Sequence, residues 1–123
     1  MPLITILVED SPTIRDNLIR AMTELVGLKV VAVAETAAEA MTLLDHHGRW
    51  QLAVIDLFLK EGSGLTVVRA CQKRNERQHI LVLTNYATAE IRRLCIDLGA
   101  DRVFDKSTEL ESYFAQCCVY ERA

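Results

Sequence analysis

Two kinds of apolar pattern alternate along the 123 residues of this chain, and this alternation limits the folds it can adopt. Five short runs are rich in β-branched residues: LITILV (3–8), KVVAVA (29–34), LAVIDL (52–57), HILVLT (79–84) and ADRVFD (100–105). Four of them are almost entirely apolar, which is typical of strands covered on both faces of a parallel sheet. The sequence therefore predicts a fully buried sheet of five strands.

Helical patterns fill the intervals between these runs, with apolar residues every three or four positions. The residues are Ile14, Leu18, Met22 and Leu25; Ala37, Ala40, Met41 and Leu44; Leu65, Val68 and Cys71; Ile91, Leu94, Cys95 and Leu98; and Leu110, Tyr113, Phe114 and Cys117. Because crossovers between parallel strands are right-handed, strict β–α alternation puts helices on both faces of one sheet. We predict a doubly wound, three-layer α/β domain over residues 1–123.

The starts of several helices are marked by residues that satisfy free backbone N–H groups. Ser11 followed by Pro12 is typical of a capped helix with proline in its first turn. Two further pairs match the capping box: Thr36 with Glu39, and Thr108 with Glu111. We expect helices to begin directly after Ser11, Thr36 and Thr108.

The composition excludes several classes of function. A formal net charge of −3 offers no general attraction to nucleic acid or to an anionic membrane. No apolar segment is long enough to span a bilayer, and no basic segment precedes the first apolar run. The four cysteines have neither zinc-type spacing nor a disulfide framework. We expect buried thiols in a cytoplasmic domain, with a redox pair at Cys117-Cys118 as the alternative.

A carboxylate interrupts the most apolar part of the chain. In AVIDLFLKEGSGL (53–65), Asp56 stands between apolar residues, where an uncompensated charge is costly to bury. Ligands of such sheets bind outside the carboxyl ends of the strands. Three other predicted strands end there in Glu9-Asp10, in Thr84 and in Lys106. One sheet edge would therefore gather three carboxylates, a hydroxyl and an ammonium group.

This set of groups suits a metal and a phosphate. Three carboxylates repel one another unless a cation lies between them, and hard oxygen ligands favour Mg²⁺. Lys106 and Thr84 would then contact phosphate oxygens, so the set suits phosphoryl transfer to a carboxylate nucleophile. Any one of these acids alone is explained as a helix cap or a loop residue. Their occurrence at several strand ends favours the metal and phosphate site.

The same residues resemble those of a known family. The segments ILVEDSPTIR (6–15), VIDLFLKEGSGL (54–65), VLTNYA (82–87) and GADRVFDKS (99–107) carry the resemblance. Over its whole length the chain resembles the receiver domain of two-component response regulators, the CheY-like superfamily. The resemblance implies a flavodoxin-like (βα)5 fold with strand order 2-1-3-4-5. It also implies a signalling domain that promotes only its own phosphorylation and dephosphorylation, rather than an enzyme.

The resemblance further implies a role for each acid. Asp56 would accept a phosphoryl group from a histidine kinase and become an aspartyl phosphate. Glu9 and Asp10 would bind Mg²⁺ together with Asp56 and the backbone carbonyl of Phe58. Mg²⁺ is thus the one cofactor that we expect.

Other residues would sense the phosphoryl group. By the resemblance, Lys106 pairs with a phosphoryl oxygen, and Thr84 bonds to the group and moves toward it. Phe104 stands at the family's switch position and turns inward when Thr84 moves. The expected partners are a sensor histidine kinase or phosphotransfer protein and a downstream output protein or domain. A second copy of the chain is another candidate partner, and nucleic acid and membranes are not expected to bind directly.

The sequence departs from the family pattern in several places. The family usually has proline after its lysine with a cis peptide between them, whereas Ser107 follows Lys106 here. Since a cis bond before serine costs about 2.5–4 kcal/mol, we expect a trans loop or a strained one, with Ser107 as a candidate cap of the last helix. Lys60 replaces another frequent proline. Phe58 and Tyr86 stand where the family controls water access, and two aromatic rings there predict slow autodephosphorylation.

Other functions fit the sequence less well. A phosphatase of the haloacid dehalogenase type would need a second Asp where Phe58 stands. A dinucleotide-binding domain would need its glycines after the first strand, whereas GSGLTV (62–67) follows the third and lacks the third glycine. The main alternative is a degenerate receiver that binds proteins independently of phosphorylation. The chain ends just after the last predicted helix, so we expect either a stand-alone regulator or part of a longer one.

Overall fold

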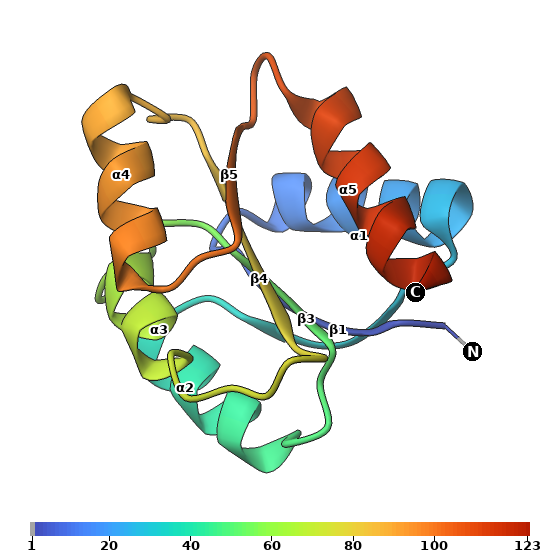
Figure 1. Cartoon of the computed structure of the whole chain (residues 1–123), viewed down its shortest axis with the longest axis horizontal. Coiled ribbons are helices and arrows are strands. Elements are labelled where there is room, and N and C mark those ends of the chain that lie inside the picture. Colours follow the sequence, from blue (N-terminus) through green and yellow to red (C-terminus); the bar gives the residue numbers. More distant parts are fainter. Residues whose placement is uncertain (1) are drawn as a thin grey trace.

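The computed structural model describes residues 2–123, and in these residues five strands alternate with five helices (Figure 1). The strands are β1 (Ile4–Val8), β2 (Lys29–Ala34), β3 (Leu52–Ile55), β4 (His79–Thr84) and β5 (Arg102–Asp105). The helices are α1 (Pro12–Val26), α2 (Ala37–His46), α3 (Gly64–Ala70), α4 (Ala89–Leu98) and α5 (Leu110–Arg122). The predicted runs 29–34 and 79–84 are strands over their full length, and the other three are shorter by one or two residues.

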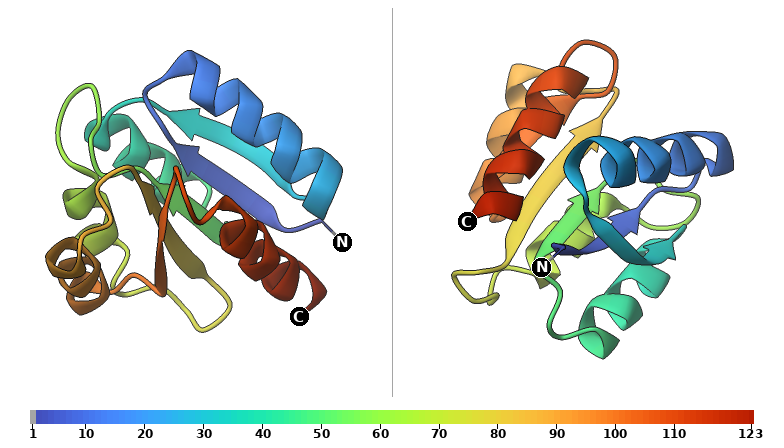
Figure 2. Two further views of the ribbon diagram at one scale, coloured as in Figure 1. Left: turned by 90° about the horizontal axis from the view of Figure 1, so that it is seen from above. Right: turned by 90° about the vertical axis from the view of Figure 1, so that its right-hand side faces the viewer.

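All neighbouring strands pair in parallel, in the order β2-β1-β3-β4-β5, as predicted. Figure 2 shows α1 and α5 on one face of the sheet and α2, α3 and α4 on the other. In β3, Leu52 and Val54 pack toward the α1 and α5 side, while Ala53 and Ile55 pack toward the opposite side. All four are fully buried, which explains why this strand has no polar alternation. The three-layer prediction is confirmed.

The helix starts agree with the sequence at two of the three marked sites. The Ser11 hydroxyl accepts a bond from the Ile14 N–H at 3.4 Å, and Pro12 is the first residue of α1. The Thr36 hydroxyl accepts from the Glu39 N–H at 3.1 Å before α2. These bonds satisfy N–H groups that the first helical turn leaves free.

The predicted caps of the last helix are wrong. Helix α5 begins at Leu110, after Glu109, and neither Ser107 nor Thr108 caps it. The Asp105 carboxylate accepts hydrogen bonds from the N–H groups of Ser107 and Thr108 at 2.7 and 3.2 Å. These bonds close a turn between β5 and α5. The helix can start only once that turn is complete.

The helical periods locate the buried faces but not their borders. Leu18, Met22, Tyr113 and Cys117 fill the layer between α1, α5 and the sheet. Four residues of the predicted stripes are instead exposed: Leu25, Met41, Leu94 and Leu110. A hydrophobic period marks the side of a helix that faces the core, and it carries no information on how far the sheet extends beneath that side.

The cysteines largely follow the prediction. All four are free thiols, and Cys71, Cys95 and Cys117 are buried while Cys118 is half-buried. Burial raises the pKa of Cys71 to about 11 and that of Cys117 to about 12. Among the helices described by the structure, none is long and apolar enough to cross a membrane.

Candidate functional site

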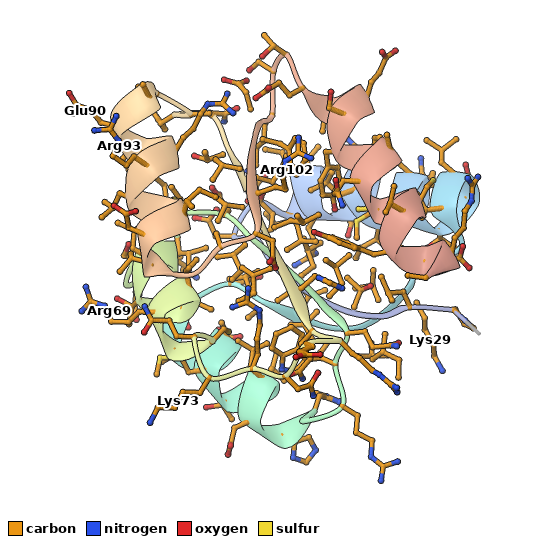
Figure 3. All side chains as sticks on the ribbon, in the orientation of Figure 1. Lys29, Arg69, Lys73, Glu90, Arg93 and Arg102 are labelled. Atoms are coloured by element: carbon orange, nitrogen blue, oxygen red, sulfur yellow. The ribbon has the colours of Figure 1, made fainter. Side chains whose placement is uncertain are left out.

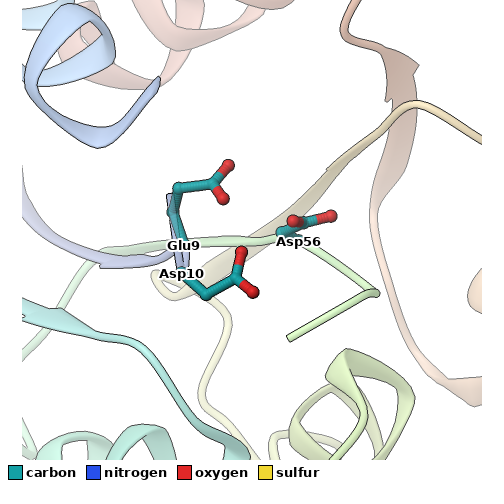
Figure 4. A group of neighbouring side chains, drawn as sticks. All are labelled: Glu9, Asp10 and Asp56. Carbon is teal, nitrogen blue, oxygen red and sulfur yellow. The ribbon is translucent and has the colours of Figure 1, made fainter. Parts of the chain in front are cut away.

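The acidic residues meet because their strands are neighbours in the sheet. Glu9 and Asp10 follow β1, and Asp56 follows β3. Backbone bonds continue the sheet pairing to these residues: Glu9 N–H donates to the Ala34 carbonyl and Asp56 N–H to the Val8 carbonyl, both at 2.9 Å. Carboxylate oxygens of Glu9, Asp10 and Asp56 lie within 4.8 Å of one another (Figure 4). Glu9 and Asp56 are buried, and Asp10 is half-buried.

Lys106 reaches this cluster from the end of β5. Its ammonium group is paired with the Glu9 carboxylate and lies 3.2 Å from Asp56 Oδ2. Only 10% of the Lys106 side chain is exposed, so these pairs are poorly screened by water. One ammonium group does not balance three carboxylates. The arrangement therefore leaves negative charge that a bound cation would compensate.

The electrostatics of Asp56 reflect this imbalance. The pKa of Asp56 is raised to about 6: burial is the largest cause, the charge of Lys106 opposes it, and the charge of Glu9 adds to it. The pKa of Asp10 is also raised, chiefly by burial and then by a hydrogen bond and the charge of Glu9. A divalent cation between these groups would favour their ionised forms. A set of three carboxylates with hard oxygen atoms fits Mg²⁺.

Thr84 of β4 and Phe104 of β5 are both buried on neighbouring strands. Thr84 ends β4, pairs in register with Asp105 of β5 and accepts a bond from the Tyr86 N–H at 3.2 Å. The Phe104 ring faces inward with 1% of its surface exposed and meets Tyr113 edge to face, with ring centroids 5.9 Å apart. The Arg102 guanidinium lies 5.0 Å from the Phe104 centroid. The predicted switch aromatic thus occupies the interior in this structure.

Phe58 and Tyr86 form an exposed aromatic pair. Their ring centroids lie 4.6 Å apart, although the two residues come from the loops after different strands. More than half of each side chain is exposed. The Phe58 N–H donates to Asp56 Oδ1 at 3.4 Å, so the backbone that carries the predicted metal-ligating carbonyl turns around the Asp56 carboxylate. The family resemblance predicts both rings near the site, but it does not predict that they touch each other.

One feature near Asp56 was not recognised in the sequence. A Cβ atom at Gly64 would lie 2.1 Å from the Asp56 carbonyl oxygen, so only glycine fits at the start of α3. The glycines of GSGL were a signal of such a close approach. The peptide between Lys106 and Ser107 is trans, in agreement with one of the two expected loop forms. Lys60 is exposed, and nothing in the structure explains its presence.

The sequence matches a family model and several known proteins. Residues 5–116 match the family model described as the response regulator receiver domain. The acid tolerance regulatory protein ActR of Rhizobium meliloti (strain 1021) is 34% identical over 113 residues, which cover 89% of this chain and 55% of ActR. The photosynthetic apparatus regulatory protein RegA of Rhodobacter capsulatus is 32% identical over 104 residues, which cover 85% of this chain and 55% of RegA. The chain thus spans about half the length of these two curated relatives.

Solved structures share the fold. The BeF3-activated N-terminal receiver domain of Klebsiella pneumoniae RstA superposes with a TM-score of 0.85 at 20% identity, covering 98% of this chain and 99% of that one. A response regulator protein from Burkholderia pseudomallei, solved with a phosphorylated aspartic acid, calcium ion and citrate, has a TM-score of 0.79 at 26% identity. That match covers 92% of this chain and 65% of the other.

Proposed function

The chain belongs to the family of response regulator receiver domains, and from this membership we propose that Asp56 is the residue that becomes phosphorylated. The observation that carries the proposal is the position of the Asp56 carboxylate. It lies at the end of β3, within 4.8 Å of oxygens of Glu9 and Asp10 and 3.2 Å from the Lys106 ammonium group. Nucleophile, candidate metal ligands and a cation for the incoming phosphate are therefore in one place.

In the proposed reaction, an oxygen of Asp56 attacks the phosphorus atom of a phosphohistidine. A P–O bond forms, the P–N bond breaks, and the imidazole leaves with the electron pair. Because the pKa of Asp56 is about 6 in the metal-free site, most of the carboxyl groups are already ionised at neutral pH. Proton removal is therefore no obstacle to the attack.

The other residues stabilise the transferred group. Glu9, Asp10, Asp56 and the Phe58 carbonyl would hold Mg²⁺, which when bound neutralises charge on the phosphoryl oxygens. Lys106 would move its contact from Asp56 to a phosphoryl oxygen. Thr84 would donate its hydroxyl to another oxygen, and Phe104 would remain inward when it does so.

The domain would serve as a switch between two proteins. The donor would be a sensor histidine kinase or a phosphotransfer protein, and the receiver would signal to an output protein or domain. ActR and RegA are regulatory proteins longer than this chain, which is consistent with receivers that act on further domains. A degenerate receiver that binds partners without phosphorylation is the alternative, and it would not need Lys106 so close to Asp56.

Exposure to acetyl phosphate, followed by intact-mass analysis, tests the proposal. With Mg²⁺ the chain is expected to gain the mass of one phosphoryl group, and EDTA is expected to prevent this gain. Asp56→Asn is the matched control, since it keeps the size of the side chain but removes the nucleophile. A wild-type chain that stays unmodified, or an Asp56→Asn variant that still gains the group, contradicts the proposal.

A further inference from the structure

Arg92 and Glu109 form a group of polar contacts near the loop that carries Lys106, and the reaction described above does not use them. Arg92 of α4 donates through Nε to the Ala87 carbonyl at 2.9 Å and through Nη1 to the Val103 carbonyl at 3.0 Å. Its Nη2 atom is paired with the Glu109 carboxylate. These acceptors belong to the loop before α4, to β5 and to the residue before α5. One guanidinium group therefore joins three segments that are separate in the sequence.

Glu109 extends these contacts to the loop that carries Lys106. Its Oε1 atom also accepts from the Asp105 N–H at 2.9 Å, and its own N–H donates to the Asp105 carbonyl at 2.9 Å. Asp105 in turn holds the N–H groups of Ser107 and Thr108. Residues 105–109 thus form a closed set of hydrogen bonds around Lys106, and Arg92 anchors one end of that set.

The hydrogen bonds within residues 105–109 shape the loop, and the pair of Glu109 with Arg92 ties it to α4. Ser107 and Thr108 are exposed, and the loop contains no proline. The Lys106 side chain has to cross from β5 to Asp56 and Glu9, and a flexible four-carbon chain places its ammonium group reliably only if its backbone is held. The backbone of Lys106 itself is held by the bond from its N–H to the Thr84 carbonyl, at 2.9 Å.

We propose that Arg92 and Glu109 are positioning residues for phosphoryl transfer. Their ion pair fixes the loop 105–109 and so holds the Lys106 ammonium group at the Asp56 carboxylate. The inference rests on the proposed function, since it assigns a role within that reaction. It differs from a purely structural role for Arg92, because the effect of Arg92 on the rate must pass through Lys106.

A double-mutant cycle measures that dependence. Arg92→Ala is made in the wild type and in Lys106→Ala, and the rate constant for phosphorylation by acetyl phosphate is measured at saturating Mg²⁺ and donor. A small displacement of a positioned group has a large effect on rate, so we expect Arg92→Ala to slow the wild type about tenfold. In the Lys106→Ala background we expect a further change of no more than about twofold.

The neighbouring Arg93 provides the matched control. It is exposed on the outer side of α4, away from the site (Figure 3). Arg93→Ala removes the same charge from the same helix and is expected to change the rate by no more than about twofold. The Mg²⁺ affinity of Arg92→Ala is expected to match that of the wild type, because Arg92 contacts none of the three acids.

Glu109→Gln separates charge from geometry, since its amide oxygen still accepts from the Asp105 N–H. Glu109→Gln is expected to slow phosphorylation less than Arg92→Ala does. The variant that carries both Glu109→Gln and Arg92→Ala should be no slower than Arg92→Ala alone. If Arg92→Ala does not fold, as judged by circular dichroism, Arg92→Lys replaces it in the same cycle. Lysine keeps the charge but cannot reach all three acceptors.

Two outcomes overturn the inference. If Arg92→Ala slows the wild type and Lys106→Ala by the same factor, Arg92 does not act through Lys106. If Arg92→Ala weakens Mg²⁺ binding as much as it slows transfer, the change is a general distortion of the site. A modified wild type with either result overturns this inference alone, whereas an unmodified wild type overturns the proposed function as well.

Discussion

At the scale of single residues, the buried carboxyl group of Asp56 makes the metal-free fold sensitive to pH. Its pKa is raised from the ordinary 3.8 to about 6, so the folded state binds this proton more tightly than the unfolded state. The resulting stabilisation is complete below about pH 4 and is lost as the pH rises through about 6. Above that, the ionised carboxylate costs on the order of 3 kcal/mol relative to the neutral form.

Asp56→Asn is therefore expected to stabilise the metal-free protein. At pH 7 the free energy of unfolding should rise by roughly 1–3 kcal/mol, since the buried charge is removed while Lys106 keeps its partner Glu9. Urea unfolding in EDTA between pH 4 and pH 8 measures this gain, which should shrink toward zero near pH 4. Equal stability of the two chains at pH 7 would contradict the argument.

At the scale of elements, Gly64 at the start of α3 packs directly against the backbone of Asp56 and Leu57. A Cβ atom at Gly64 would lie 2.1 Å from the Asp56 carbonyl oxygen and 2.7 Å from the Leu57 Cα atom. Both are backbone atoms, so relief requires the end of β3 to move. Gly64→Ala is expected to lower the free energy of unfolding by about 3 kcal/mol or more and to slow phosphorylation.

Gly48→Ala is the control for that substitution. The nearest atom to a Cβ atom there is the Asp45 carbonyl oxygen, at 3.9 Å. Its free energy of unfolding should stay within about 0.5 kcal/mol of the wild type. Urea unfolding curves of the three proteins decide the matter, and similar losses in both variants would show that the close approach to Asp56 is not the cause.

The loops after β3 and β4 meet through Phe58 and Tyr86, and this contact should set the lifetime of the phosphoryl group. If the pair limits the approach of water, Phe58→Ala and Tyr86→Ala should each accelerate autodephosphorylation by roughly three- to tenfold. The decay of the phosphorylated protein in EDTA, followed by intact mass, gives the rate. Phe58→Leu keeps an apolar side chain and should have the smaller effect. A lifetime unchanged by both alanine variants would exclude the shielding role.

The same elements show which parts of the structure could be read from the sequence. Strands and helices followed from local periods, and the gathering of Glu9, Asp10, Asp56 and Lys106 followed from a rule of topology, since carboxyl ends of parallel strands share one edge. The predicted capping box of Thr108 and Glu111 is wrong because the Thr108 N–H, which Glu111 would bind in such a box, donates to the Asp105 carboxylate instead. That competition depends on the backbone conformation of the turn, which residue types alone do not determine.

The contacts that the sequence did not reveal join residues on different loops or helices. Arg92 and Glu109 are separated by 17 positions, and their pairing requires α4 to lie beside the end of β5. Phe58 and Tyr86 meet for a similar reason, because β3 and β4 are adjacent in the sheet. The distance between side chains on two such elements is set by packing, so it becomes visible only in three dimensions.

At the scale of the whole molecule, the three acids lie where the adjacent strands β1 and β3 end, in the middle of the sheet. The carboxylates of Glu9, Asp10 and Asp56 repel one another across that junction, and Lys106 balances only part of their charge. A divalent cation bound there would relieve the repulsion in the folded state alone. Unfolding separates the three acids and removes the site, so binding of Mg²⁺ should stabilise the entire domain.

Thermal and urea unfolding with and without Mg²⁺ measure this effect. At a Mg²⁺ concentration of about 100 times Kd, the free energy of unfolding should rise by about 2.7 kcal/mol, and EDTA should reverse the gain. NaCl at matched ionic strength separates specific binding from screening and should give a much smaller rise. Asp10→Asn should lose most of the Mg²⁺ effect, because it removes a candidate ligand that is not paired with Lys106. Equal stabilisation by NaCl and by Mg²⁺ would mean that the three acids do not form a metal site.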